Sequence, residues 1–272
     1  MTRTDWGEPV ALGRTGRLVS RLGIGSSYGV SKAACLRAFD RGVNYFFWGS
    51  ARMPGMAHAI RDLNPSHRGE LVVVLQCYVR VASLVSRSVE RGLATLGLDT
   101  ADVLLLGWYD RFPAARVLAA AEDLKRRGLV RHLAVSTHQR PLARAFIEDQ
   151  RFEVLHLRYN AAHTGAEQDV FPHLSTHPRP GIVAFTCTRW GDLLNPQKMP
   201  PGEAPLSAAD CYRFALSSPH VDVAICGPKN DAEMDHALTA LELGPLDEGE
   251  MQRARKIGTR VHETKALADW IR

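Results

Sequence analysis

The sequence predicts an α/β protein, a single (β/α)8 TIM barrel domain spanning residues 1–272. Short apolar runs alternate eight times with amphipathic stretches, and continuous apolar strands are typical of a parallel sheet covered by helices. Eight such units in about 250 residues match the size of a closed barrel. The first run is followed by Ser26, Ser27 and Tyr28. It therefore lacks the third glycine of the G-x-G-x-x-G motif that an open dinucleotide-binding sheet carries there.

Each expected strand is followed by one expected helix. The strands are expected at residues 22–25, 43–47, 71–75, 103–106, 132–135, 154–157, 182–185 and 221–225. The helices are expected at residues 32–41, 55–63, 84–96, 114–127, 141–148, 167–174, 208–216 and 232–241.

Glycine and proline support this division. Gly42 and Gly128 follow two of the predicted helices and suit a left-handed helix end. Pro141 suits the first position of the fifth helix, where its missing N–H costs nothing. The proline-rich stretch 195–205 predicts a long loop after the seventh strand, on the face where barrel enzymes build their sites.

The composition limits the kinds of partner that we expect this protein to bind. The chain has 34 basic and 29 acidic residues, and the excess of +5 is scattered, so we expect no nucleic-acid binding. It has neither an apolar signal core nor a run long enough to cross a membrane, so we expect no membrane association.

The five cysteines show no CxxC spacing, which predicts buried free thiols and a cytoplasmic location. The histidines show no metal-binding spacing, and we expect no metal.

Several landmarks occur in a characteristic order. Segment 12–23, LGRTGRLVSRLG, suggests a tight hairpin before the first strand. The others are GVNYF at 42–46, Tyr159-Asn160 after the sixth strand, GDLL at 191–194 and Gly227 after the eighth. Over roughly residues 10–260 the chain resembles the aldo-keto reductase superfamily. This resemblance implies a barrel closed at its bottom by the hairpin, with NADPH-dependent carbonyl reduction at the C-terminal face.

The resemblance also implies a catalytic Asp, Tyr, Lys and His at strand ends, where a tuned tyrosine donates a proton. In this sequence the four positions hold Phe47, Arg52, Gln76 and Gly107. Arginine can stabilise an anion but cannot act as an acid near neutral pH. Three tyrosines just past strand ends are alternative groups near the mouth: Tyr28, Tyr78 and Tyr109.

A cofactor site for NADP(H) is implied by the same resemblance. Its residues would be Ser136, His156, Tyr159, Thr186, Thr188, Gly191, Lys229, Asn230 and Glu233. The first three would meet the nicotinamide, the next three the pyrophosphate, and the last three the adenosine with its 2′-phosphate. Backbone N–H groups in such a loop suit phosphate.

These observations lead to one hypothesis and two alternatives. We expect an NADP(H)-binding oxidoreductase with a non-standard active site and a small-molecule ligand at the C-terminal face. One alternative is an inactive barrel that serves as a ligand sensor or partner subunit. Another is a lyase or isomerase that uses Arg52 and the histidines. The fold alone cannot choose among them, because function depends on the site. The oligomeric state stays open.

Overall fold

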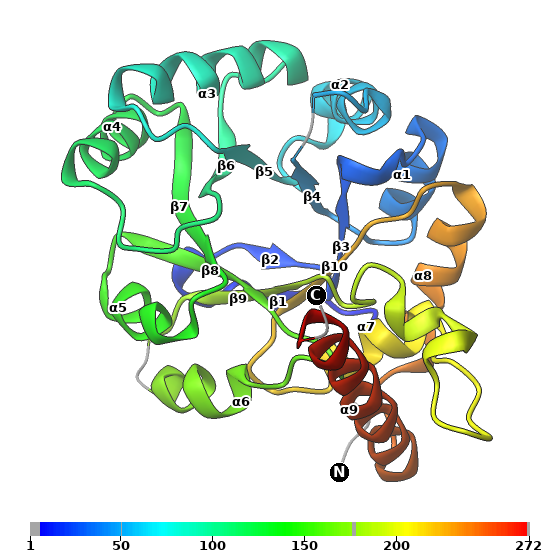
Figure 1. The fold of residues 1–272 in the computed structure, drawn as a ribbon. Coiled ribbons are helices and arrows are strands. Elements are labelled where there is room, and N and C mark those ends of the chain that lie inside the picture. Colours follow the sequence, from blue (N-terminus) through cyan, green and yellow to red (C-terminus); the bar gives the residue numbers. More distant parts are fainter. Residues whose placement is uncertain (1–5, 50, 176–177, 271–272) are drawn as a thin grey trace.

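The computed structural model describes residues 6–49, 51–175 and 178–270, and within these residues eight parallel strands close into a barrel (Figure 1). Each strand pairs with the next along the chain, and the last closes the ring by pairing Ala224 with Leu22 of the first. The strands are β3 (Leu22–Gly25), β4 (Tyr45–Trp48), β5 (Val72–Cys77), β6 (Ala101–Leu106), β7 (Val130–Thr137), β8 (Phe152–Arg158), β9 (Gly181–Phe185) and β10 (Val223–Cys226). The predicted fold class is confirmed.

A helix follows each barrel strand, and these helices form the outer layer of the molecule (Figure 1). They are α1 (Lys32–Asp40), α2 (Gly55–His67), α3 (Ala82–Leu96), α4 (Ala115–Arg126), α5 (Ala143–Glu148), α6 (Ala166–Asp169), α7 (Ala208–Leu216) and α8 (Asp231–Leu243). The expected long loop lies between β9 and α7 and contains two short 3-10 helices, η5 (Asp192–Leu194) and η6 (Pro196–Lys198).

Two helix predictions were wrong in detail. The helix expected at 167–174 is divided into α6 and a 3-10 helix, η4 (Phe171–Ser175). Pro172 has no N–H with which to continue the α-helical hydrogen bonds. Pro141 lies in the first turn of a separate 3-10 helix, η3 (Arg140–Leu142), ahead of α5. Its missing N–H is equally harmless in that turn.

The helix ends follow local chemistry. Gly42 and Gly128 have φ values of 86° and 74°, so both adopt the left-handed conformation expected of them. Helix α7 begins with a capping box, in which the Ser207 hydroxyl accepts from the backbone of Asp210 and the Asp210 carboxylate accepts from the backbone of Ser207. This cap sets the point at which the long loop returns to the barrel.

The apolar side chains form two layers on either side of the sheet. The barrel interior holds a small cluster, and a larger cluster packs between the strands and the helices. Tyr45 lies in the interior cluster and is completely buried, as its place two residues before Phe47 predicts. The five cysteines are free and buried, as expected.

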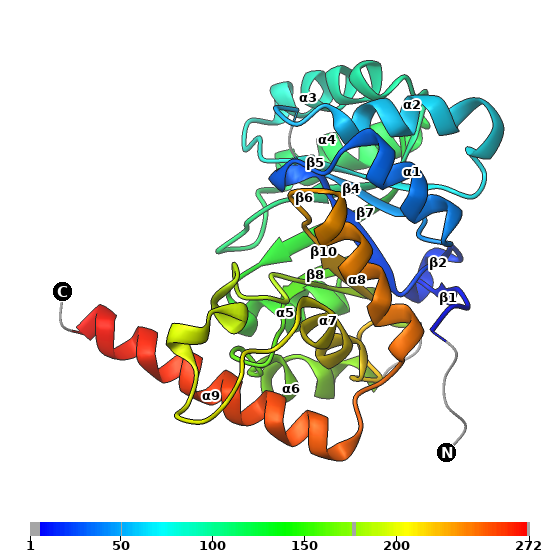
Figure 2. The same ribbon diagram turned by 90° about the vertical axis from the view of Figure 1, so that its right-hand side faces the viewer.

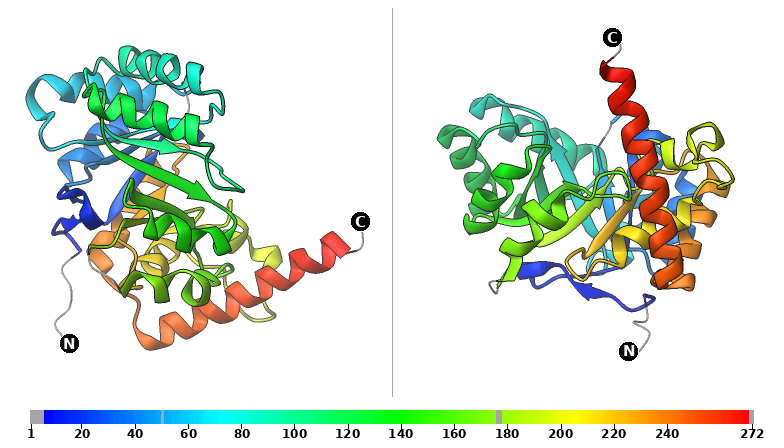
Figure 3. Two further views of the ribbon diagram at one scale, coloured as in Figure 1. Left: turned by 90° about the vertical axis from the view of Figure 1, so that its left-hand side faces the viewer. Right: turned by 60° about the horizontal axis from the view of Figure 1, so that its bottom comes forward.

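The N-terminal hairpin closes the bottom of the barrel, as predicted (Figure 3). It consists of β1 (Val10–Ala11) and β2 (Leu18–Val19) with a 3-10 turn, η1 (Gly13–Thr15), between them. Gly13 has a φ of 47°, and a Cβ there would lie 2.0 Å from the backbone N of Gly181, at the start of β9. Only glycine permits this approach.

A final helix, α9 (Glu248–Trp270), was not predicted. It runs along the side of the barrel and its C-terminal end extends past the rest of the fold (Figure 2). The helix is polar except for a narrow stripe in which Ala254, Ile257 and Val261 are buried. That spacing of three and four residues is the helical signal that could have revealed it. No helix in the described part of the chain is long and apolar enough to cross a membrane.

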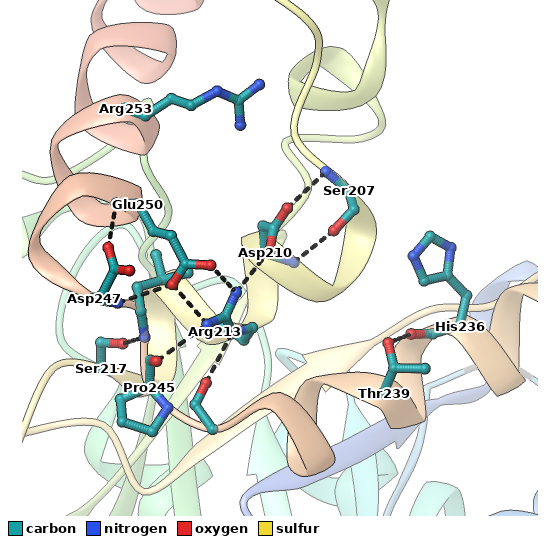
Figure 4. Close-up of polar contacts among 12 residues, drawn as sticks. Ser207, Asp210, Arg213, Ser217, His236, Thr239, Pro245, Asp247, Glu250 and Arg253 are labelled. Atoms are coloured by element: carbon teal, nitrogen blue, oxygen red, sulfur yellow. Dashed lines mark hydrogen bonds and ion pairs between the residues drawn. The ribbon is translucent and has the colours of Figure 1, made fainter. Parts of the chain in front are cut away.

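The buried side chain of Arg213 joins α7 to α9 (Figure 4). It donates two hydrogen bonds to Glu250 at 2.9 and 2.7 Å and one to Asp210 at 3.0 Å. It also reaches the carbonyl oxygens of Gly244 and Pro245, which follow α8. Because the guanidinium of Arg213 bonds to two carboxylates and two carbonyl oxygens, its positive charge is buried with partners.

Candidate functional site

A cavity of about 560 Å³ opens among the C-terminal ends of the barrel strands. Of the residues expected to bind a dinucleotide, those that line it are Ser136, His156, Thr186, Thr188, Gly191, Lys229 and Glu233. They come from β7, β8, the loop after β9 and the start of α8. The fold thus brings together residues that are up to 97 positions apart in the sequence (233 − 136).

Ser136 lies near the end of β7 and is almost fully buried in the wall of this cavity. Its hydroxyl oxygen accepts a hydrogen bond of 2.9 Å from the backbone N–H of Trp108. A hydroxyl has one proton to donate as well as lone pairs to accept. The contact with Trp108 uses a lone pair, so the Ser136 proton stays available to an acceptor in the cavity.

His156 lies on the inner face of β8 and is the strand partner of Ser136 in β7. Its Nε2 lies 2.9 Å from the hydroxyl of Tyr45, and its ring centroid lies 5.7 Å from that of Phe47. Burial lowers the pKa of His156 to about 3, so the imidazole is neutral at physiological pH. It offers the cavity a neutral polar group and no positive charge.

The loop after β9 has an unusual backbone. Thr186, Arg189 and Trp190 have φ values of 54°, 53° and 54°, and Gly191 has 89°. Each left-handed non-glycine residue costs roughly 1 kcal/mol, so surrounding contacts must hold the loop. Asn160 supplies one by donating to the carbonyl of Thr186 at 2.8 Å. The loop thus follows a path that local preferences alone would not select, and its Thr186, Thr188 and Gly191 face the cavity.

Another part of the cavity wall is formed by residues at the start of α8. The Asn230 carboxamide caps this helix by accepting from the backbone of Glu233 at 2.9 Å, and the Glu233 carboxylate accepts from the backbone of Lys229 at 2.9 Å. Lys229 and Glu233 line the cavity, whereas Asn230 acts as the helix cap and is not among the described lining residues. The lysine and the helix N-terminus together favour an anion here.

Tyr159 lies in a different place from the one expected. Its hydroxyl donates to Glu167 at 2.7 Å, and its ring packs against Phe171 and Phe214. It lines a second pocket among the outer helices instead of the cavity. The reason is the alternation of side chains along β8, because Val154 and His156 face the interior while Leu157 and Tyr159 belong to the outer cluster.

Of the four positions where the resemblance places catalytic groups, three lie at the cavity and one lies outside it. Phe47 and Gln76 line the cavity. Gly107 is buried beside them, and a Cβ on it would lie 2.4 Å from Nε2 of Gln76 and 3.0 Å from the ring of Tyr78. Gln76 and Tyr78 therefore occupy the space that a side chain at 107 would need. Arg52 is exposed and is not among the described residues that line the cavity.

Of the three tyrosines considered near the mouth, Tyr28 and Tyr78 line the cavity, while Tyr109 is buried. Tyr78 is half exposed, and its hydroxyl hydrogen-bonds with Gln76. Burial raises the pKa of Tyr78, and the bond with Gln76 opposes this rise. The phenol is therefore neutral and retains its proton at neutral pH.

Sequence reasoning missed Arg80. Its guanidinium donates to the carbonyl oxygens of Tyr78 at 3.1 Å and Trp108 at 2.7 Å, and also to that of Gly107. It stacks over the ring of Tyr109 at 3.9 Å. Arg80 thereby holds the ends of β5 and β6 together beside the cavity. An arginine in a loop carries no periodic signal, so only the fold reveals this role.

The described residues contain no group of three or more His, Cys, Asp or Glu side chains arranged to hold a metal ion. The cavity lining offers hydroxyl, imidazole, amide and aromatic groups, together with the ammonium of Lys229 and the carboxylate of Glu233. This combination suits an organic ligand that carries both an apolar ring and an anion.

Comparisons with known proteins agree with the fold. The profile of the aldo/keto reductase family matches residues 31–194, more than half of the chain. Among solved structures, an aldo-keto reductase from Bacillus halodurans is similar in its holo form, with a TM-score of 0.76 and 17% identity over 92% of this chain and 96% of that chain. Its apo form gives 0.75 and 18% over 92% and 95%. These structural similarities show the fold. No curated protein sequence is a match.

Proposed function

The chain belongs to the aldo/keto reductase family, and we propose that it is an oxidoreductase that binds NADP(H) across the C-terminal face of the barrel. One observation carries this proposal. Seven of the nine residues expected at a dinucleotide site line a single cavity, although they come from four separate parts of the chain.

The residues present fit such a cofactor. The free proton of the Ser136 hydroxyl suits the carbonyl oxygen of a carboxamide, and the neutral His156 beside it adds a polar contact without repelling a charged ring. Lys229 and the N-terminus of α8 suit a phosphate at the other end. When bound, NADPH would supply the hydride for reduction of a carbonyl group.

The source of the proton follows from what lines the cavity. Phe47 and Gln76 cannot donate a proton to a carbonyl oxygen, and Arg52 is outside the lining. Tyr78 has a neutral phenol in the cavity wall, hydrogen-bonded to Gln76, and we assign it the role of general acid. The active site is then non-standard, because the proton comes from the end of β5.

A titration with NADPH tests the cofactor proposal. Trp108 and Trp190 line the cavity, so their fluorescence should change and reach saturation as NADPH binds. Lys229→Met should weaken NADPH more than NADH, because only NADPH carries the additional phosphate. Lys125→Met, on the distant helix α4, is the matched control and should change neither. Absence of binding at millimolar NADPH would contradict the proposal.

The same measurements separate the alternatives. A ligand sensor or partner subunit would bind NADPH and turn over no carbonyl compound in a broad panel. A lyase or isomerase that relies on Arg52 gains no support from the geometry, since this residue is exposed away from the cavity wall.

A further inference from the structure

Arg158 lies beside two residues that line the cavity, although it is itself not among the described lining residues. It is the last residue of β8 and pairs with Phe185 of β9. Like His156 two positions before it, it belongs to the inward-facing set of β8. Phe185 and His138 both line the cavity, with ring centroids 5.5 Å apart. The pKa of His138 is lowered mainly by burial and to a smaller extent by the positive charge of Arg158.

Among the described residues, Arg158 has no carboxylate partner, although its side chain is half-buried. Its charged neighbours are two further arginines, Arg140 on the loop after β7 and Arg189 on the loop after β9. Burial lowers the pKa of Arg158, and the charges of these two arginines lower it further. A half-buried cation between two others is unfavourable unless an anion joins it.

The acidic residues of this region are already paired with other cations. Asp169 accepts from Arg140 at 2.6 Å, and Asp192 pairs with both Arg189 at 3.4 Å and Lys198 at 2.5 Å. Glu167 pairs with Arg255 at 2.8 Å. The rim above β8 therefore retains a net positive charge with one guanidinium open to a ligand.

We propose that the substrate reduced in this cavity is an aldehyde or ketone that also carries a carboxylate, and that Arg158 binds this carboxylate. The proposal rests on the oxidoreductase function proposed above. A guanidinium matches a carboxylate through two parallel hydrogen bonds, which fixes the direction of the ligand as well as its charge. In the reaction, hydride and proton add across the C=O bond to give an alcohol, NADPH becomes NADP+, and the carboxylate is unchanged.

Position distinguishes this carboxylate from the phosphates of the cofactor. Lys229 and the N-terminus of α8, which suit a phosphate, follow β10, whereas Arg158 ends β8 two residues after His156, the strand partner of Ser136. The latter two are the groups that suit a nicotinamide. An anion on Arg158 thus lies near the redox end of the site.

A pair of probes that differ in one charge tests the proposal: 4-carboxybenzaldehyde and its methyl ester. Calorimetric titration of each into the full-length protein, with and without saturating NADP+, which carries no hydride to transfer, measures the ratio of their Kd values. We expect the acid to bind about tenfold more tightly than the ester, with a ratio near one in Arg158→Gln. Arg158→Lys should keep part of the preference, since it retains the charge without the planar fork.

Arg144→Gln is the matched control, because it removes one positive charge from the neighbouring helix α5 at an exposed position. It should leave the ratio unchanged. A ratio near one in the wild type, an unchanged ratio in Arg158→Gln, or an equal loss in Arg144→Gln would each overturn the assignment. If Arg158→Gln fails to fold, Arg158→Lys still tests the proposal, because its preference for the acid over the ester should lie between that of the wild type and a ratio of one.

NADPH binding by the same variants separates this proposal from the one it rests on. If NADPH does not bind but the acid preference depends on Arg158, the cofactor proposal fails and the carboxylate site stands. If Arg158→Gln weakens NADPH and leaves the ratio of acid to ester unchanged, Arg158 binds the cofactor and the substrate proposal is overturned.

Discussion

Gly107 and the two side chains above it show how one small residue changes the chemistry of the site. Without a Cβ at 107, the Gln76 amide and the Tyr78 ring extend over the end of β6. A phenol therefore comes to the cavity from β5. At this position any larger side chain would displace both groups, so the three residues act as a unit.

Tyr78→Phe tests the assignment of the general acid. We expect kcat for NADPH-dependent carbonyl reduction to fall about 10²- to 10⁴-fold, the usual worth of a general acid, while Kd for NADPH stays unchanged. Tyr28→Phe, which removes the other half-exposed phenol of the cavity, is the control. Equal losses in both variants, or no turnover by the wild type, would show that Tyr78 does not have this role.

His156 makes stability depend on pH. The unfolded chain takes up a proton at this histidine near pH 6.5, whereas burial delays protonation of the folded state to about pH 3. The folded state therefore loses stability as the pH falls from 6.5, by about 1.4 kcal/mol per pH unit at full effect. In His156→Gln, urea unfolding at pH 7 and pH 5 should show a smaller loss than the wild type shows. His58→Gln, at an exposed position, is the control, and its loss of unfolding free energy between pH 7 and pH 5 should equal that of the wild type.

At the scale of elements, α9 joins two segments that are far apart in the sequence. Arg255 pairs with Glu167 of α6, and Lys256 pairs with Glu203 in the loop after β9 at 2.8 Å. In the same helix Gly258 lies directly against the β8–α6 loop, where a Cβ would be 2.0 Å from the carbonyl oxygen of Ala161. The backbone on both sides leaves no room for adjustment.

Gly258→Ala should therefore destabilise the protein by about 2 kcal/mol, because an added methyl group forces two backbones apart. Gly249→Ala in the same helix is the matched control, since its nearest contact would be 3.5 Å, and it should be neutral or stabilising by up to about 1 kcal/mol. Thermal unfolding of the two variants measures the difference. Equal melting temperatures would mean that α9 does not pack as described.

At the scale of the whole molecule, a closed barrel joins every strand to two neighbours, so we expect residues 1–272 to unfold as one domain in a single transition. NADPH at about 100 times its Kd should raise the free energy of unfolding by about 2.7 kcal/mol. Calorimetry with and without NADPH measures both. Two separate transitions would contradict the single domain, and an unchanged melting temperature would contradict cofactor binding to the folded state.

The sequence by itself determined the barrel, because alternation of apolar runs and turn residues is a local property that survives without coordinates. It predicted the eight strand–helix units. The candidate cofactor residues were implied by the family resemblance, and three of them, Ser136, Thr186 and Lys229, line one cavity. Only the tertiary structure decided which face each strand-end residue presents. It turned Tyr159 outward, left Asn230 as a cap and set Arg158 among two other arginines without an acid. These three features depend on the strand register and on which charges the fold brings close together. Neither can be predicted from a short segment of the sequence.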